Sequence, residues 1–279
     1  MTTHKIRQMK GKKKIVMLTA YDAPSARILS DCGVDIILVG DSVGNTLLGY
    51  ESTIPVTLND IIHHSAAVAR AKPNSLIVGD LPFMSYKISE EQALENCGRM
   101  LQEGGAEAVK MEGSGRIADR VEAVVQAGIP VMGHIGLTPQ SIYEFGGYRV
   151  QGRTIESAEL LVQQARRLED AGAFSLVIEL VPDETAKKIT ESVEIPTIGI
   201  GAGPHCDGQV LVLWDMLGLF DDFKPKFVKK YANIRSVMSD AVKQYVAEVR
   251  EGEFPDMEHS FAMEEENSGR LYGRDKPSD

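Results

Sequence analysis

The chain has 279 residues, a mass of 30.5 kDa and a formal net charge of −10 at pH 7. Its 43% hydrophobic and 25% charged residues are typical of a folded globular protein. The negative charge argues against binding of nucleic acid or anionic lipid by electrostatic attraction. Three widely separated cysteines without a Cys-x-x-Cys pair argue against a disulfide scaffold or a zinc ribbon.

The N-terminal segment has lysines at Lys10 and at 12–14, followed by the apolar run Ile15–Ala20. This run is too short for the hydrophobic part of a signal peptide, and Tyr21 and Asp22 end it. No other stretch approaches the roughly 18 apolar residues that a membrane span needs. We therefore expect a soluble, cytoplasmic protein whose cysteines are reduced thiols.

Short apolar runs alternate with longer amphipathic segments along the chain. Apolar residues at nearly every position of a run are typical of parallel strands that are buried on both faces. The expected strands, in chain order, are Ile15–Ala20, Asp35–Gly40, Ser75–Asp80, Glu107–Glu112, Pro130–His134, Ser175–Leu180, Pro196–Ile200 and a weaker eighth near Met216–Phe220.

Helical periodicity fills several of the intervals between these strands. One predicted helix begins after Thr57 and runs to about Ala71, and another begins at Ser89. Two more cover about Ile155–Ala171 and Pro182–Ser192. Glycines that would cap helices just before a strand are Gly33, Gly105, Gly128 and Gly172.

About eight strand–helix units in about 250 residues favour a (β/α)8 barrel, also called a TIM barrel. A doubly wound sheet has the same local pattern, but the glycine-rich stretch 199–204 lacks the spacing of a dinucleotide-binding motif. We expect one barrel domain over residues 1–261 and a disordered polar tail over residues 262–279. A last helix, about Ala232–Arg250, presents an apolar stripe.

Acidic residues stand at the ends of four of five consecutive predicted strands, and these are Asp41, Asp80, Glu112 and Glu179. In a parallel barrel, the loops that follow the strands form the active site. The first three carboxylates should therefore converge, and a divalent cation would relieve their mutual repulsion. Ligand sets made of oxygen alone favour a hard ion, Mg²⁺ first. The alternative for each single residue is a helix cap.

Four features of the sequence bear on the chemistry at this rim. Lys110 is two residues before Glu112, on the same face of its strand, where it can neutralise a bound carboxylate. The apolar neighbours of Glu179 would raise its pKa, which would suit it to act as a general base. The alternative is that Glu179 is a structural carboxylate of the barrel held in a salt bridge. His134, placed with the substrate-binding residues, either donates a hydrogen bond to an oxyanion or satisfies a loop carbonyl. The long glycine-rich segment Leu137–Thr154 suggests a lid.

Several long motifs resemble those of the ketopantoate hydroxymethyltransferase family, in the same order and over about residues 3–261. These motifs are Val39–Gly44, Gly79–Met84, Val109–Gly113, Gly133–Gln140, Phe145–Tyr148 and Ile198–Gly203. The resemblance implies a (β/α)8 barrel, Mg²⁺, 5,10-methylenetetrahydrofolate as co-substrate and a ring-shaped homo-oligomer, commonly a homodecamer. The chain departs from the family pattern within Pro204–Cys206 and past Phe261.

The resemblance also implies roles for single residues. The implied magnesium ligands are Asp41, Asp80 and Glu112, the implied 2-oxo acid ligands are Asp41, Ser42, Asp80 and Lys110, and the implied base is Glu179. The implied reaction moves a hydroxymethyl group from 5,10-methylenetetrahydrofolate to 3-methyl-2-oxobutanoate. It gives 2-dehydropantoate (ketopantoate) for pantothenate and coenzyme A biosynthesis, through a magnesium-stabilised enolate.

Two other functions are compatible with the same residues. A metal-dependent 2-oxo acid lyase or mutase of the isocitrate-lyase type would use the same barrel and the same acidic rim. The Lys-Lys-Cys-Gly-His signature of those lyases is absent from the sequence, which disfavours them. A binding protein without catalytic activity would leave the acidic strand ends without a task.

Overall fold

The structure is a computed structural model that describes residues 1–220, 225–263, 267 and 271. The chain divides into two compact units, Met1–Tyr231 and Ala232–Asp279. The first unit is shorter than the single domain that we expect over residues 1–261, and the extent of that domain stays a prediction. Most of the tail expected to be disordered, residues 262–279, lies outside the described residues.

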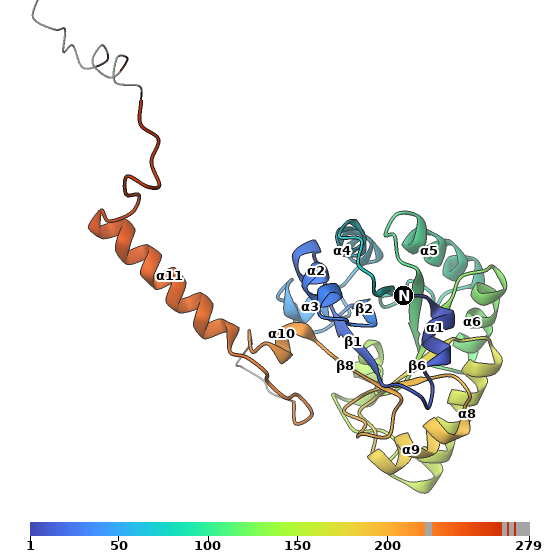
Figure 1. Ribbon diagram of the computed structural model, residues 1–279. Helices are drawn as coiled ribbons and strands as arrows, with labels where there is room; N and C mark the ends of the chain where they lie inside the picture. Colours follow the sequence, from blue (N-terminus) through green and yellow to red (C-terminus); the bar gives the residue numbers. More distant parts are fainter. Residues whose placement is uncertain (221–224, 264–266, 268–270, 272–279) are drawn as a thin grey trace, which may run out of the picture. The chain divides into compact units, whose positions relative to one another are not determined.

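The first unit is built on eight parallel strands that close into a barrel (Figure 1). Each strand pairs with the next in chain order, and the eighth pairs with the first. The strands are β1 (Ile15–Thr19), β2 (Ile36–Val39), β3 (Leu76–Asp80), β4 (Ala108–Glu112), β5 (Val131–Gly136), β6 (Ser175–Glu179), β7 (Thr197–Ile200) and β8 (Gly208–Leu211). The predicted barrel is confirmed.

Helices follow most of the strands and pack on the outside of the barrel (Figure 1). The helices of this unit are α1 (Thr3–Gln8), α2 (Ala23–Asp31), α3 (Val43–Thr46), α4 (Leu58–Arg70), α5 (Glu90–Gln102), α6 (Arg116–Gln126), the 3-10 helix η1 (Pro139–Ser141), α7 (Ile142–Phe145), α8 (Ile155–Asp170), α9 (Asp183–Ser192) and α10 (Leu213–Met216). The four capping glycines have positive φ, as predicted. The segment expected to be a lid contains η1 and α7.

Two hydrophobic clusters divide the core according to the alternation of side chains along the strands. Residues such as Ile36 and Leu38 of β2 belong to the cluster that fills the barrel. Ile37 and Val39 of the same strand belong to the larger cluster, which contains the buried residues of the helices. Burial on both faces explains why these strands are apolar at almost every position.

Seven predicted strands lie within two residues of the observed ones, but the eighth prediction is wrong. The segment 216–220 ends α10 and continues as a turn, whereas β8 begins at Gly208. A Cβ at Gly208 would lie 2.5 Å from the backbone oxygen of Ile15, so only glycine lets this strand approach β1 closely enough to pair. A short strand that begins with a glycine has few apolar residues, so the apolar pattern that revealed the other strands is weak in β8.

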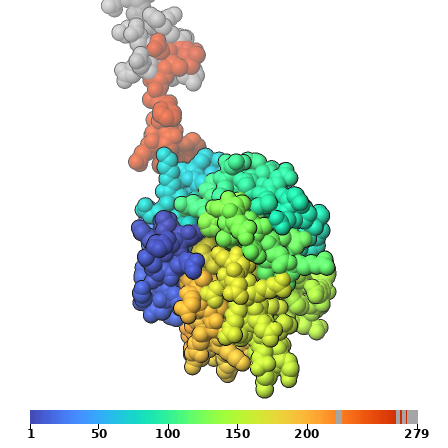
Figure 2. All heavy atoms as spheres, turned by 90° about the vertical axis from the view of Figure 1, so that its right-hand side faces the viewer, coloured from blue at the N-terminus to red at the C-terminus, as the bar shows by residue number. Residues whose placement is uncertain are grey.

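The N-terminal segment closes one end of the barrel. Ile6 of α1 is fully buried and belongs to the cluster inside the barrel. Lys10 forms a salt bridge of 3.0 Å with Asp207, just before β8. In Figure 2 the N-terminal segment, dark blue, correspondingly lies beside the orange part of the chain. The opposite end, where the strands finish, is thus left for a site.

The second unit contains α11 (Ile234–Glu251), which Asn233 caps at its N-terminus and Gly252 at its C-terminus. The helix has the predicted apolar stripe, and all of its side chains in the stripe are at least partly exposed in the single chain. The exposed apolar residues of α11 are Val237, Met238, Val242, Tyr245, Val246 and Val249. No helix among the described residues is both long and apolar enough to cross a membrane.

Replacing Gly136 by alanine should destabilise the barrel, because φ is +91° and the new Cβ would lie 2.2 Å from the backbone oxygen of Glu179. We expect a loss of about 2 kcal/mol or more in the free energy of unfolding, measured by urea denaturation. The matched control is Gly98→Ala in α5, where a Cβ meets nothing within 4 Å. That variant should be equally or more stable than the parent chain. Equal stability of both variants would contradict the prediction.

Candidate active site

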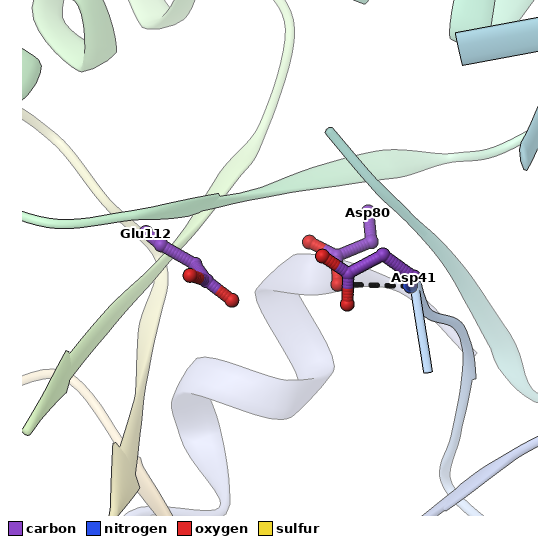
Figure 3. Close-up of side chains that lie close together, drawn as sticks. All are labelled: Asp41, Asp80 and Glu112. Atoms are coloured by element: carbon purple, nitrogen blue, oxygen red, sulfur yellow. Dashed lines mark hydrogen bonds between the residues drawn. The ribbon is translucent and has the colours of Figure 1, made fainter. Parts of the chain in front are cut away.

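Three carboxylates from neighbouring strands meet at the open end of the barrel. Asp80 and Glu112 are the last residues of β3 and β4, and Asp41 lies two residues after β2. One oxygen of each lies within 4.8 Å of the others, and the side chains point toward a shared space (Figure 3). Their exposed fractions are 4% or less. The predicted convergence is confirmed.

None of the three carboxylates caps a helix in the part of the chain that the structure describes. The N-caps of α4, α5 and α6 are Thr57, Ser89 and Gly115, and that of α3 is Ser42. Asp80 instead accepts a hydrogen bond from the backbone nitrogen of Asp41 at 3.4 Å (Figure 3). The capping alternative is therefore wrong for these residues.

Lys110 is the cation at the centre of the cluster, and it is 3% exposed. Its Nζ lies 2.8 Å from Asp80 Oδ1 and 3.5 Å from Glu112 Oε1. Burial acts to lower the pKa of Lys110, but attraction to Asp80 and Glu112 outweighs burial and raises it. The side chain is therefore a permanent positive charge at neutral pH.

The carboxylates differ in how well they are neutralised. Burial, and then repulsion from Asp80, raise the pKa of Asp41 well above its ordinary value. Burial also raises the pKa of Asp80, against the attraction of Lys110. Burial acts in the same direction on Glu112, but attraction to Lys110 and contacts with His134 lower its pKa to about 2. The cluster is therefore short of positive charge next to Asp41.

His134 lies between two carboxylates. Its Nδ1 is 3.3 Å from Glu112 Oε1, and its Nε2 is 3.3 Å from Glu179 Oε2. Burial and the nearby Lys110 act to lower its pKa, but the contacts with both carboxylates raise it to about 9. The ring therefore contacts side chains of the cluster. This arrangement differs from the alternative in which the ring satisfies a loop carbonyl. Its assignment to substrate binding stays a prediction.

Glu179 and Ser42 flank this cluster. The Glu179 side chain, at the end of β6, is 15% exposed, so solvent or a ligand reaches it more easily than the other three carboxylates. Ser42 Oγ lies 2.8 Å from the hydroxyl of the buried Tyr21. Their predicted roles, as base and as substrate ligand, are not decided by these contacts.

Two buried residues of this site carried no predicted role. Gln140 contacts both Asp41 and Glu112, and Tyr86 contacts both Gln140 and Glu112. Gln140 lies in η1 after β5, Tyr86 lies in the loop after β3, and neither is charged, so they lacked the signal that revealed the carboxylates. An amide or a phenol in such a loop more often faces water.

The donor set fits a hard divalent ion. Three buried carboxylates offer oxygen ligands only, and their positive neighbours do not compensate the charge around Asp41. Asp41, Asp80 and Glu112 are the residues that would hold such an ion. A magnesium ion is the best match, because it accepts a few carboxylates and keeps its other positions for water or substrate.

Solved structures of low sequence identity share the fold. A 2,3-dimethylmalate lyase of the PEP mutase/isocitrate lyase superfamily aligns with a TM-score of 0.59 and 17% identity, covering 98% of this chain and 94% of that chain. A phosphonopyruvate hydrolase, solved with oxalate and Mg²⁺, aligns with a TM-score of 0.58 and 12% identity, covering 98% and 96%. At these identities both likenesses show the fold alone.

Sequence relatives are much closer. The 3-methyl-2-oxobutanoate hydroxymethyltransferase of Thermotoga maritima is 58% identical over 261 residues, which are 94% of this chain and 96% of that protein. The enzyme of the same name from Syntrophomonas wolfei is 54% identical over 263 residues, 94% and 95% of the two chains. The family model described as ketopantoate hydroxymethyltransferase matches residues 1–257. The chain therefore belongs to the ketopantoate hydroxymethyltransferase family.

Proposed function

We propose that this chain transfers a hydroxymethyl group from 5,10-methylenetetrahydrofolate to 3-methyl-2-oxobutanoate and so produces ketopantoate. The observation that carries the proposal is the convergence of Asp41, Asp80 and Glu112 around Lys110 in a barrel whose relatives bear the name of this activity. The shared fold also accommodates 2-oxo acid lyases and mutases. The high identity to the transferases favours the transferase over that alternative.

The 2-oxo acid would bind where the positive charges of the site lie. Its carboxylate is an anion, so Lys110 is its natural partner, and Asp41, Asp80 and Ser42 lie around the same space. The carboxylates alone would repel the substrate. A divalent ion held by Asp41, Asp80 and Glu112 would supply Lewis-acid stabilisation of negative charge on the substrate.

Glu179 is the proposed general base. It accepts the proton from C3 of the 2-oxo acid, and this carbon then forms a bond to the one-carbon unit of the folate. Both carbon–nitrogen bonds that join the one-carbon unit to the folate break, and water supplies the hydroxyl group of the product. The proton from C3 and the second proton of that water go to the two folate nitrogens. His134, 3.3 Å from Glu179, orients the carboxylate and balances its charge before the proton moves.

The segment Leu137–Thr154 is the proposed lid, and it carries Tyr148 beyond the part that contacts the carboxylates through Gln140. Burial raises the pKa of the Tyr148 phenol, and repulsion from Glu179 and Asp41 adds to this effect, which indicates that the hydroxyl lies near the site. Tyr148 is half exposed, so part of its ring is accessible to a co-substrate. A lid here would separate the site from bulk solvent while leaving room for the one water molecule that reacts.

Removing divalent metal should abolish product formation, because the buried carboxylates would then repel the substrate. We expect at least about a 100-fold loss after treatment with a chelator, and recovery on adding Mg²⁺, in a coupled assay for ketopantoate. The same assay run without 5,10-methylenetetrahydrofolate serves as the control. Consumption of the 2-oxo acid without the folate, measured directly by NMR, would favour the lyase alternative.

Glu179→Ala should lose exchange of the C3 proton, because it removes the proposed proton acceptor. We expect the rate of exchange of 3-methyl-2-oxobutanoate in D2O, followed by NMR, to fall about 10²- to 10⁴-fold, while substrate binding is retained. Glu122→Ala, which removes an exposed carboxylate of α6, should exchange at the parental rate. Near-parental exchange by Glu179→Ala would rule out its role as base.

The proposed assembly is a homo-oligomer, for which a homodecamer is the predicted size. The apolar stripe of α11 supports association, because a contiguous exposed stripe of this kind is typical of an interface.

Placing the reaction in the cytoplasm stays a prediction. All three cysteines are free, as predicted.

Val242→Asp should dissociate the assembly, because it puts a charge in the middle of the apolar stripe. We expect a decrease in the molar mass measured by light scattering after size-exclusion chromatography. Ala247→Asp adds the same charge to another, less apolar face of α11 and should leave the mass unchanged. An unchanged mass for Val242→Asp would show that the stripe does not hold the subunits together.

A further inference from the structure

Gln140 joins the carboxylate cluster to the segment that follows β5. It belongs to η1 and is 2% exposed. Its Nε2 donates to Asp41 Oδ2 at 3.1 Å and to the carbonyl oxygen of Leu81 at 2.8 Å. Its backbone N–H donates to Glu112 Oε2 at 3.1 Å. One residue of the segment thus holds an oxygen of two carboxylates that come from different strands.

Asp41 and Leu81 fix the orientation of the Gln140 amide, and Tyr86 contacts its oxygen. The buried Tyr86 hydroxyl lies 2.9 Å from Gln140 Oε1 and 3.1 Å from the carbonyl oxygen of Glu112. The same hydroxyl accepts a hydrogen bond of 3.0 Å from the backbone N–H of Glu112. If the amide were turned over, its oxygen would face the carboxylate of Asp41 and the carbonyl of Leu81. Only one orientation therefore lets the Gln140 amide donate to both Asp41 and Leu81.

We infer that Gln140 and Tyr86 are positioning residues that hold Asp41 and Glu112 in the arrangement needed by a divalent ion. The inference rests on the proposed function, since it concerns the same ion site. Repelling carboxylates in a buried cluster turn away from each other unless something holds them. The neutral donors of Gln140 hold one oxygen of each without neutralising the charge that attracts the cation.

A second consequence follows from the position of Gln140 in the chain. It lies three residues after the start of the segment Leu137–Thr154 that carries Tyr148. An ion that fixes Asp41 and Glu112 also fixes their hydrogen bonds to Gln140, and with them the beginning of the segment. Binding of the ion should therefore slow hydrogen–deuterium exchange of the backbone amides of this segment.

The test measures binding of Mg²⁺ alone by isothermal titration calorimetry, with no substrate present. Gln140→Met keeps the length of the side chain and the backbone donor but removes the amide, and we expect Kd for Mg²⁺ to rise about 10- to 100-fold. Tyr86→Phe removes only the hydroxyl, and we expect a smaller rise of a few fold. In both variants Mg²⁺ should slow exchange in the segment less than in the parent chain.

Ser75→Ala is the matched control. Ser75 is a buried residue before the start of β3, far along the strand from Asp80, and its hydroxyl donates to the carbonyl oxygen of Val34 at 2.6 Å. Losing this hydrogen bond should lower thermal stability and leave Kd for Mg²⁺ unchanged. A purely structural role of Gln140 and Tyr86 would give the same result as this control.

The outcomes separate the inference from the function on which it rests. Parental Kd values in folded Gln140→Met and Tyr86→Phe, with a parent chain that binds Mg²⁺, would overturn the inference alone. A parent chain that does not bind Mg²⁺ would overturn the ion site and the inference together. If Gln140→Met does not fold, the milder Tyr86→Phe decides, because its ring still fills the same space.

Discussion

Carboxylates buried side by side repel each other and lose their hydration, so a fold can keep them together only if opposite charge and hydrogen-bond donors surround them. In this chain the charge comes from Lys110 and from His134, whose pKa its carboxylate neighbours raise, and neutral donors come from Gln140 and from the backbone. These contacts neutralise Glu112 well and Asp41 poorly. The remaining deficit of positive charge is what makes the site attractive to a divalent ion.

The barrel meets this constraint through the alternation of its strands. Val78 and Ala108 fill the interior, and Asp80 and Lys110 follow them at a spacing of two, on the same face. The register pairs Asp80 with Lys110 directly, which places the carboxylate beside its counter-ion. The charged cluster is therefore the last layer of the barrel filling, and α1 closes the other end of the same interior.

Much of this arrangement was predictable, because it depends on local patterns. Apolar runs reveal strands that are buried on both faces, and an acidic residue at the end of such a run reveals a site residue. β8 was missed because a strand that begins at a glycine, chosen for close approach to β1, has a weak apolar pattern. Gln140 was missed because its partners come from three other strand ends, a relation that only the closed barrel creates.

The place of His134 has a consequence for how losses of function combine. Its ring lies between Glu112, which belongs to the ion side, and Glu179, which belongs to the base side. Substitution of either carboxylate removes one of the two contacts that raise the pKa of the His134 ring. It therefore changes the electrostatic environment of the remaining carboxylate. Substitutions on opposite sides of the imidazole are thus energetically linked, and their separate effects do not simply add.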